Sequence, residues 1–325
     1  MRLVGTHPAP PFDEELQSML PLIHESLPVT ITPSHIPSLR ENNLGALSIE
    51  EVIGRRAIEH TTHIAPGTGG APSIVLSVFA PAQPASPRPA IYFVHGGGMF
   101  MGDRFSGAPQ YLNWVEELDV AVVSGEYRLA PENPDPAPHD DCLAGLLWTF
   151  ANAEELGIDA KRIVIAGASA GGGLAAGVVL KLRDSHMPLP LGQMLIYPML
   201  DDRNETVSSH QIDGIGVWDR GSNETGWNAL LGERRGGADV DAYSAPGREQ
   251  NLTGLPPTFI DVGTADLFRD EAVSYARRIW EDGGVAELHA WPGGFHGFDV
   301  LVPDAQLSKA AFAARVNWLR RILVA

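Results

Sequence analysis

One serine lies among residues that have almost no side chain. It stands in the segment Gly167-Ala168-Ser169-Ala170-Gly171, between the apolar run RIVIA and a helical pattern that opens at Ala170. A sharp strand-to-helix turn needs glycines beside it, because larger side chains would clash, and the free N–H groups of the helix start attract negative charge. The pattern predicts either an ordinary tight turn or a nucleophilic serine presented by one.

A second glycine-rich segment, His95-Gly96-Gly97-Gly98, directly follows the apolar run AIYFV. Consecutive glycines free backbone N–H groups to point into a cavity, which is what stabilising an oxyanion requires. The other interpretation is a flexible turn after a strand. The position of the His95-Gly96-Gly97-Gly98 segment upstream of the serine segment favours the oxyanion interpretation.

A serine nucleophile needs a base, and eleven histidines are present. His296 stands out in WPGGFHGFD, where it follows the run VAELHAW and has Gly293, Gly294 and Gly297 around it. This context predicts a loop after a strand, on the side of the sheet where Ser169 would lie. His289 lies within the preceding strand pattern, and we interpret it as structural.

The base in turn needs an acid to orient it, and TFIDVGTADLFRDE offers three aspartates. Asp261 lies within the strand pattern, and Asp270 has the position of a helix start. Asp266 follows the strand end, where a loop can carry it toward His296. We therefore predict Asp266 as the acid, in the chain order serine, acid, histidine that the G-x-S-x-G turn uses.

The elements that must position these residues alternate between strands and helices, which indicates a mainly parallel sheet covered on both faces. The first two strands lack a helix between them and are expected to pair antiparallel at one edge. Predicted strands are 58–64, 73–80, 90–95, 120–124, 163–167, 192–197, 258–263 and 285–291, and the clearest helices are 137–153, 170–184, 270–282 and 304–323.

Two regions differ from this alternation. Residues 1–55 have a helical pattern, with apolar side chains spaced three and four apart from Phe12 to Ile23, and Ser48 with Glu51 has the form of a capping box. Residues 201–256 lose strand character and are rich in Gly, Asp, Asn and Arg.

Composition narrows the function class. The net charge of −17 disfavours nucleic acid as a partner, because phosphate binding needs clustered Lys and Arg. No apolar run reaches the length of a membrane span, and the first residues lack an apolar secretory core, so we expect a cytoplasmic protein. The single Cys142 agrees with a reducing compartment, and we interpret it as a small packing residue.

Five ordered motifs together resemble the hormone-sensitive-lipase-like esterases, the bacterial family IV carboxylesterases: HGGG, YRLAPENPDPAPHDD, GASAGGGLA, LPPTFIDVGTADLFRDEA and GGFHGF. The resemblance implies an α/β-hydrolase catalytic domain over 56–200 and 257–325, with a helical cap formed by 1–55 and 201–256. It also implies hydrolysis of short-acyl esters without metal or organic cofactor.

Carried over by position, Ser169, Asp266 and His296 match the catalytic triad of that family. Gly97, Gly98 and Ala170 match its oxyanion N–H donors, within the motifs that also contain His95, Gly96, Gly167 and Gly171. The expected partner is a small-molecule ester, and the sequence leaves a homodimer open.

Two positions depart from the family pattern. Ala168 stands where an Asp or Thr is usual before the nucleophile, and Leu267 replaces the usual Pro after the acid. Ala168 leaves the substrate preference open. Other acyl bonds, such as a lactone, carbamate or amide, and a non-catalytic ligand receptor are the alternative functions.

Polar residues near the YRLAPE segment have another interpretation. We expect them to brace loops through hydrogen bonds without taking part in the chemistry: Glu126, Tyr127, Arg128, Asp140 and Asp141.

Overall fold

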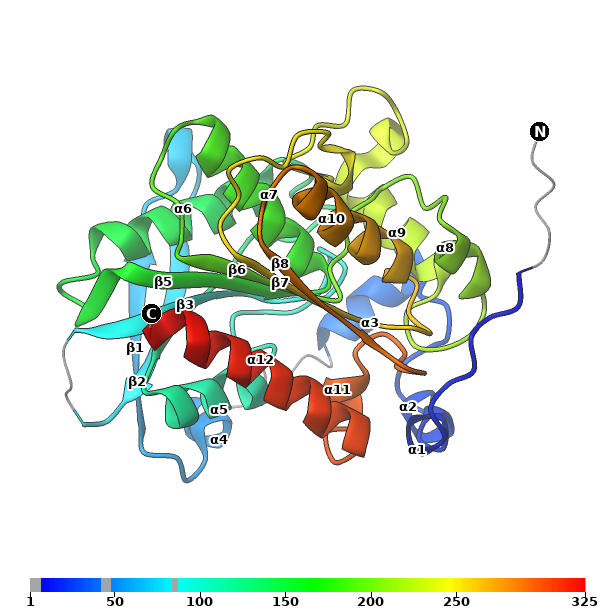
Figure 1. Cartoon of the computed structure of the whole chain (residues 1–325), viewed down its shortest axis with the longest axis horizontal. Coiled ribbons are helices and arrows are strands. Elements are labelled where there is room, and N and C mark those ends of the chain that lie inside the picture. Colours follow the sequence, from blue (N-terminus) through cyan, green and yellow to red (C-terminus); the bar gives the residue numbers. More distant parts are fainter. Residues whose placement is uncertain (1–6, 42–47, 84–86, 325) are drawn as a thin grey trace.

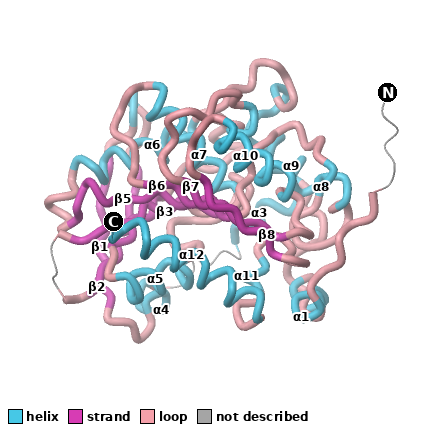
Figure 2. The backbone as a smooth tube through the Cα atoms, viewed as in Figure 1, coloured by secondary structure: helices cyan, strands magenta, loops and turns pink. Residues whose placement is uncertain are grey.

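The computed structural model describes residues 7–41, 48–83 and 87–324, and within them an eight-stranded sheet lies between layers of helices (Figures 1 and 2). The strand order is β1-β2-β4-β3-β5-β6-β7-β8. The strands are β1 (Ile58–Ala65), β2 (Ile74–Pro81), β3 (Arg88–Val94), β4 (Ala121–Gly125), β5 (Ile158–Ala168), β6 (Gly192–Ile196), β7 (Thr258–Gly263) and β8 (Ala286–Trp291).

The pairing directions confirm the predicted α/β class. β2 runs antiparallel to both of its neighbours, β1 and β4, and every other neighbouring pair is parallel. The central strands β4, β6 and β7 are buried along their whole length, as expected for a parallel sheet covered on both faces. The edge strand β1 carries polar residues that reach solvent.

Helices cover both faces of this sheet (Figure 1). On one face lie α6 (Ala137–Ala151), α7 (Ala170–Asp184) and α10 (Arg269–Glu281), and on the other lie α5 (Ala108–Leu118) and α12 (Gln306–Val324). The four helices predicted from the sequence are confirmed to within two residues at each end. The sequence analysis did not predict α5. Its aromatic and β-branched residues have modest helix propensity, and burial of Tyr111, Trp114 and Val115 in the core stabilises the helix.

One strand begins earlier than its apolar pattern indicates. β5 was predicted from residue 163 and starts at Ile158, where it pairs with Arg88 of β3 before a register shift. Ile158 is buried, but Asp159, Lys161 and Arg162 are polar, and Asp159 Oδ2 accepts a hydrogen bond from Arg162 Nε at 2.8 Å. Because these polar residues separate Ile158 from the apolar run that begins at Ile163, the sequence pattern does not mark the start of the strand.

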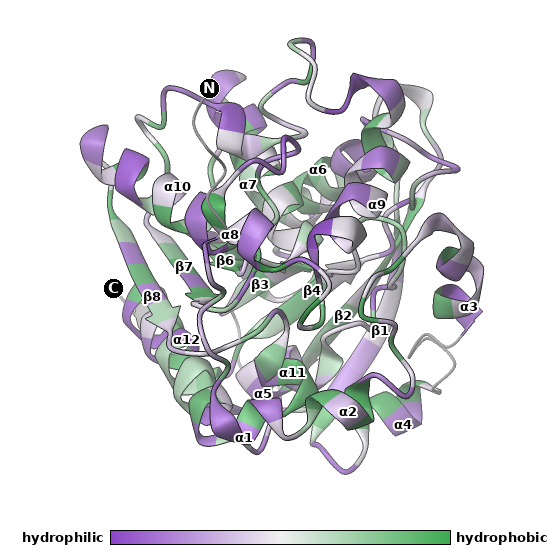
Figure 3. Cartoon of the chain, turned by 90° about the vertical axis from the view of Figure 1, so that its right-hand side faces the viewer, coloured by the Kyte–Doolittle hydropathy of each residue, from purple (hydrophilic) through white to green (hydrophobic). Residues whose placement is uncertain are grey.

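The N-terminal region and the insertion both contain helices, and all of them except α4 (Ile49–Ile53) lie on the side of the molecule that Figure 3 faces, the right-hand side of Figure 1. They are α1 (Glu14–Gln17), α2 (Leu20–Ile23), α3 (Ile36–Glu41) and α4, then α8 (Val207–Gln211) and α9 (Arg220–Leu231). Thr30 Oγ1 donates to Asp219 Oδ2 at 2.6 Å, and Thr225 Oγ1 donates to the Ile31 carbonyl at 2.8 Å. The two regions therefore contact each other, although residues 1–6 and 42–47 of the predicted segment lie outside the described ones.

Two smaller predictions are confirmed. Ser48 Oγ accepts from the Glu51 N–H at 3.3 Å, and Glu51 Oε2 accepts from the Ser48 N–H at 2.7 Å, which completes the capping box of α4. Cys142 is a buried packing residue in α6, and burial raises the pKa of its thiol. Within the described ranges, no helix is both long enough and apolar enough to cross a membrane.

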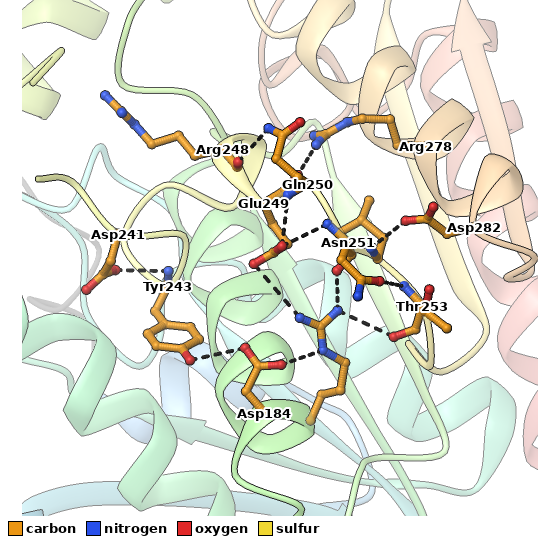
Figure 4. Close-up of polar contacts among 12 residues, drawn as sticks. Asp184, Asp241, Tyr243, Arg248, Glu249, Gln250, Asn251, Thr253, Arg278 and Asp282 are labelled. Carbon is orange, nitrogen blue, oxygen red and sulfur yellow. Dashed lines mark hydrogen bonds and ion pairs between the residues drawn. The ribbon is translucent and has the colours of Figure 1, made fainter. Parts of the chain in front are cut away.

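The last part of the insertion, before β7, is attached to α7 and α10 by polar contacts (Figure 4). Tyr243 Oη donates to Asp184 Oδ2 at the end of α7 at 3.1 Å. Arg278 of α10 donates to the Glu249 carbonyl, and Asp282 Oδ2 accepts from the Leu252 N–H at 2.5 Å. These contacts fix the position at which the chain re-enters the sheet.

A buried acid at the start of α10 links stability to pH. Glu271 is buried, and its Oε1 accepts a hydrogen bond from the Leu200 N–H at 2.7 Å. Burial raises the pKa of this carboxyl well above its usual value, and the nearby Asp201 and Asp266 act in the same direction. The protonated form therefore stabilises the fold. That contribution is complete below the pKa of the unfolded chain and is lost as pH rises through the folded-state pKa.

We predict that Glu271→Gln raises the melting temperature increasingly as pH rises from about 4 toward neutral. Glutamine keeps an acceptor for the Leu200 N–H and cannot ionise, so the variant avoids the cost of a buried charge. Melting curves across this pH range measure the effect, with Glu281→Gln, at an exposed site of the same helix, as the control. A melting-temperature difference that stays constant with pH would contradict the prediction.

Candidate active site

Ser169 occupies a strained turn between β5 and α7. Its backbone φ is 57° and its ψ is −122°, a conformation that non-glycine residues rarely adopt. The end of β6 and the residues after it bind the turn, since the Ser169 N–H donates to the Ile196 carbonyl at 2.9 Å and the Met199 N–H donates to the Ser169 carbonyl at 3.0 Å. These two bonds hold the backbone from which the hydroxyl projects.

The glycines around this turn are required by close backbone approach. A Cβ on Gly171 would lie 2.1 Å from the Val94 carbonyl oxygen, and a Cβ on Gly167 would lie 2.2 Å from the Gly171 carbonyl oxygen. Backbone atoms cannot move aside as a flexible side chain can. The steric reason for this sequence pattern is therefore present in the structure.

The sheet register brings the other two predicted residues together. Gly263 of β7 is aligned with Trp291 of β8, so the loops that follow these neighbouring parallel strands leave the sheet side by side. The first loop carries Asp266 and the second carries His296. The alternative acids lie elsewhere. Asp261 is in β7 and contacts Arg315, and Asp270 Oδ2 accepts from the Ser208 N–H of α8 at 2.7 Å.

Three side chains form a continuous hydrogen-bond chain. His296 Nδ1 lies 2.9 Å from Asp266 Oδ2, and His296 Nε2 lies 2.8 Å from Ser169 Oγ. A carboxylate only accepts, so Nδ1 carries the proton and Nε2 is left to accept from the hydroxyl. Asp266 is fully buried and its other oxygen accepts from the Phe268 N–H at 2.9 Å, which holds the carboxylate in place.

The N-terminal helices fix the loop that carries His296. The Asp13 N–H donates to the Gly293 carbonyl at 3.0 Å, and the rings of Phe12 and Phe295 meet edge to face with centroids 6.1 Å apart. The apolar residues whose helical spacing was noted in the sequence pack here, against Phe295 and Phe298: Phe12, Leu16, Met19, Leu20 and Ile23. A segment remote in sequence therefore supports the histidine.

The glycine-rich loop after β3 lies against the serine turn. A Cβ on Gly96 would be 2.9 Å from the Ala168 carbonyl oxygen, so the two segments are in backbone contact. Gly97 and Gly98 have φ values of 109° and 59°, and among the described residues neither donates its N–H to another group. Ala170 is the first residue of α7, where helix N–H groups have no partner within the helix.

His95 holds the glycine-rich loop after β3 in place. Its ring stacks on Tyr127 with centroids 4.0 Å apart, and Tyr127 Oη donates to the His95 carbonyl at 3.0 Å. His95 Nδ1 donates to the Gly96 carbonyl at 2.8 Å, and burial lowers the pKa of the imidazole. His95 is therefore neutral at neutral pH and has a positioning role.

The predicted bracing groups are confirmed with one exception. Arg128 binds Asp141 through two hydrogen bonds of 2.8 Å, and Arg104 donates to Glu126 at 2.8 Å. Tyr127 acts through the His95 contact. Asp140 is partly exposed on α6, and among the described residues its carboxylate contacts only His139 of the same helix, 3.6 Å from Oδ1 to Nδ1, which braces no loop. His289 lies in β8 and contacts Glu287, as the structural interpretation expects.

A cavity of about 280 Å³ opens above Ser169 and His296. Sequence reasoning missed most of its wall, which comes from other regions: Leu27 and Ile31 from the N-terminal region, Val217 and Trp218 from the insertion, and Tyr197 after β6. Trp218 lies against Gly98, and Tyr197 meets the His296 ring edge to face at 4.9 Å. The one signal in the sequence for this wall was a tryptophan, Trp218, in an otherwise polar segment.

Within the described part of the chain, no group of three His, Cys, Asp or Glu side chains is placed to hold a metal ion.

Comparisons with known proteins agree with this architecture. The sequence profile of the alpha/beta hydrolase fold family matches residues 91–300. Carboxylesterase NlhH from Mycobacterium tuberculosis is 31% identical over 90% of this chain and 92% of its own length, and esterase LipI from the same species is 32% identical over 67% and 68%.

Solved structures extend the likeness over nearly the whole chain. A bacterial heroin esterase is 38% identical with a TM-score of 0.89, over 96% of this chain and 98% of its own. Esterase LipW from Mycobacterium marinum is 31% identical with a TM-score of 0.84, over 97% and 99%. The chain belongs to the α/β-hydrolase-fold family, in its hormone-sensitive-lipase-like branch of carboxylic ester hydrolases.

Proposed function

We propose that this protein hydrolyses short-acyl carboxylic esters in two steps, with Ser169 as the nucleophile, His296 as the base and Asp266 as the orienting acid. The observation that carries the proposal is the chain of hydrogen bonds, 2.9 and 2.8 Å long, that joins the three side chains at the floor of a cavity. Named carboxylesterases among the relatives support the same class of reaction.

In the first step, His296 Nε2 takes the hydroxyl proton as Ser169 Oγ bonds to the ester carbonyl carbon. The carbonyl electron pair moves onto its oxygen, and the N–H groups of Gly97, Gly98 and Ala170 stabilise the resulting oxyanion. Asp266 stabilises the imidazolium without taking its proton. When the electron pair returns, the ester C–O bond breaks and His296 protonates the departing alcohol.

In the second step, water replaces the alcohol. His296 accepts a proton from the water as its oxygen attacks the acyl carbon, and the same N–H groups stabilise the second oxyanion. Collapse breaks the bond to Ser169 Oγ, which recovers its proton from His296. The acid is released and the starting state is restored.

We also propose that 1–55 and 201–256 form a cap over the 56–200 and 257–325 catalytic domain. The contacts of Asp219 with Thr30 and of Thr225 with Ile31 support a joint cap, and Trp218 and Leu27 supply part of the cavity wall. The cytoplasmic location and a homodimer stay predictions.

A serine-directed phosphorylating reagent should attach to Ser169 and abolish ester hydrolysis, because its hydroxyl is the one that His296 contacts. Mass mapping of peptides after treatment with diisopropyl fluorophosphate locates the adduct. Ser106 also lines the cavity but is bound to Asp103, so Ser106→Ala should still be labelled and Ser169→Ala should not. An adduct on another serine would exclude Ser169 as the nucleophile.

Asp266→Asn should damage turnover far more than Asp270→Asn. An amide at the orienting position favours the wrong imidazole tautomer, which lowers kcat by about 10⁴-fold in serine proteases. Asp270 lies in the first turn of α10 and contacts Ser208, so its loss should cost stability, with roughly 0.3–1 kcal/mol from the helix dipole alone. The measurements are kcat and melting temperature. Loss of turnover in a folded Asp270→Asn variant, with Asp266→Asn active, would reverse the assignment.

Short acyl chains should be hydrolysed faster than long ones. The cavity of about 280 Å³ lies at the small end for ligand sites, and Trp218 and Ile31 form part of its wall. Values of kcat/KM for nitrophenyl esters from acetate to laurate measure the preference, with the nitrophenyl group held constant. A maximum at laurate would contradict the short-acyl assignment.

A further inference from the structure

An arginine from the N-terminal region binds the loop that carries the proposed oxyanion donors. Arg40 lies near the end of α3, and its Nε donates to the Phe100 carbonyl at 2.7 Å. Its Nη2 donates to the Ala130 carbonyl at 2.7 Å, and the guanidinium also binds both carboxylate oxygens of Glu132 at 2.9 Å. One side chain therefore joins the N-terminal region to two separate segments of the 56–200 part of the chain.

The two carbonyl oxygens depend on this arginine. Phe100 and Ala130 are both fully buried, and the Ala130 N–H donates to the Met99 carbonyl at 2.9 Å, so the two segments lie side by side. Among the described residues, neither carbonyl accepts a hydrogen bond from a group other than Arg40. A buried carbonyl without a donor is costly, so loss of the guanidinium would favour a shift of both segments toward water.

The backbone of the loop needs such support. Three consecutive residues have positive φ: Gly97 at 109°, Gly98 at 59° and Met99 at 66°. A non-glycine residue such as Met99 is strained there, and this conformation persists only where its surroundings hold it. The N–H groups of Phe100 and Met101 donate to the Gly97 carbonyl at 3.1 and 3.0 Å, so Phe100 closes the turn that Gly97 opens. A shift of Phe100 would therefore move the N–H groups of Gly97 and Gly98.

The side chain of Phe100 extends this support into the cavity. Its ring stacks on Trp218 with centroids 5.9 Å apart and an angle of 22° between the planes. Trp218 in turn lies against Gly98 and lines the cavity above Ser169. Phe100 is thus held at its carbonyl by Arg40 and at its ring by Trp218, directly beside the oxyanion donors.

From these contacts, and resting on the proposed function, we propose that Arg40 is a positioning residue for the oxyanion donors. Arg40 is not among the residues of the cavity wall, so it acts through the loop. By binding the Phe100 and Ala130 carbonyls together, it keeps the N–H groups of Gly97 and Gly98 where negative charge develops on the ester oxygen. A planar guanidinium suits this role because it presents several donors in fixed directions, whereas the ammonium of lysine is a compact point charge.

Arg40→Met tests this role, because methionine keeps an unbranched apolar stem and removes every donor. The matched control is Arg56→Met: the side chains of Arg40 and Arg56 are 28% and 30% exposed, and each pairs with a glutamate remote in sequence. Since removing one oxyanion donor outright costs about a hundredfold or more in kcat, kcat/KM for nitrophenyl acetate should fall about tenfold when the donors are only displaced in Arg40→Met. It should stay unchanged in Arg56→Met, and melting curves show whether both variants are folded.

A pair of ketone inhibitors separates displaced oxyanion donors from a general loosening of the fold. Trifluoromethyl pentyl ketone adds reversibly to a serine nucleophile: Ser169 Oγ bonds to the carbonyl carbon, the hydroxyl proton passes to His296, and the carbonyl electron pair becomes an oxyanion. Methyl pentyl ketone has a similar shape and binds without this addition. In Arg40→Met the inhibition constant of the trifluoromethyl ketone should rise about tenfold, while that of the methyl ketone stays unchanged.

Equal changes of the two inhibition constants in Arg40→Met would overturn the positioning role, and so would the absence of any change in the folded variant. The same selective rise in Arg56→Met would overturn it as well. If Arg40→Met does not fold, Arg40→Lys gives the answer, because one ammonium cannot hold both carbonyls in the geometry of the fork. A selective rise for the trifluoromethyl ketone in Arg40→Lys supports the role, and an unchanged constant overturns it.

Failure of the proposed function would give a different result. In that case the unmodified protein does not hydrolyse nitrophenyl acetate, or hydrolysis persists in Ser169→Ala. Loss of the positioning role alone leaves hydrolysis by the unmodified protein and its dependence on Ser169 intact.

Discussion

The close approach of three backbone segments around Ser169 sets the geometry on which the rest of the site depends. The serine turn contacts the loop after β3 on one side and the residues after β6 on the other, with positions at Gly171 and Gly96 where a Cβ would lie within 2.1 and 2.9 Å of a carbonyl oxygen. The strain of a positive φ at Ser169 is thus held by packing from both sides. One consequence is that the oxyanion loop and the hydroxyl cannot move independently.

The site residues at strand ends could be predicted from the sequence, because the constraints on them are local. Gly167, Ser169 and Gly171 follow one strand and open one helix, and His296 and Asp266 each follow a strand end. Parallel strands place such ends on one edge of the sheet, so chain order and strand pattern are enough to bring Ser169, Asp266 and His296 near one another. The structure adds the distances, which no pattern specifies.

The residues of the cavity wall could not be predicted in this way, because the wall depends on contacts between regions remote in the chain. Trp218 reaches Gly98 only after the insertion folds over the sheet, and Gln110 reaches Asp299 only after α5 and α11 (Phe298–Leu301) pack together. α5 itself was not predicted, since its helix is stabilised by burial against the sheet and its residues have weak local preference. The same holds for the start of β5, where backbone pairing continues beyond the hydrophobic pattern. Tertiary contacts therefore determine α5, the start of β5 and the cavity wall, which the periodicity of the sequence does not specify.

A buried ion network explains how the two loops of the acid and the base stay aligned. Arg315, from α12, donates to Asp261 in β7 and to Asp299 in α11. Asp261 precedes the loop of Asp266 and Asp299 follows the loop of His296, so one guanidinium ties the start of one loop to the end of the other. Burial raises the pKa of Asp261, and the neighbouring Arg315 opposes that effect. Hydrophobic residues of the same volume could fill the space at less cost. Directional hydrogen bonds, unlike hydrophobic contacts, fix the relative orientation of β7 and α11, and the 2.9 Å contact between Asp266 and His296 depends on that orientation.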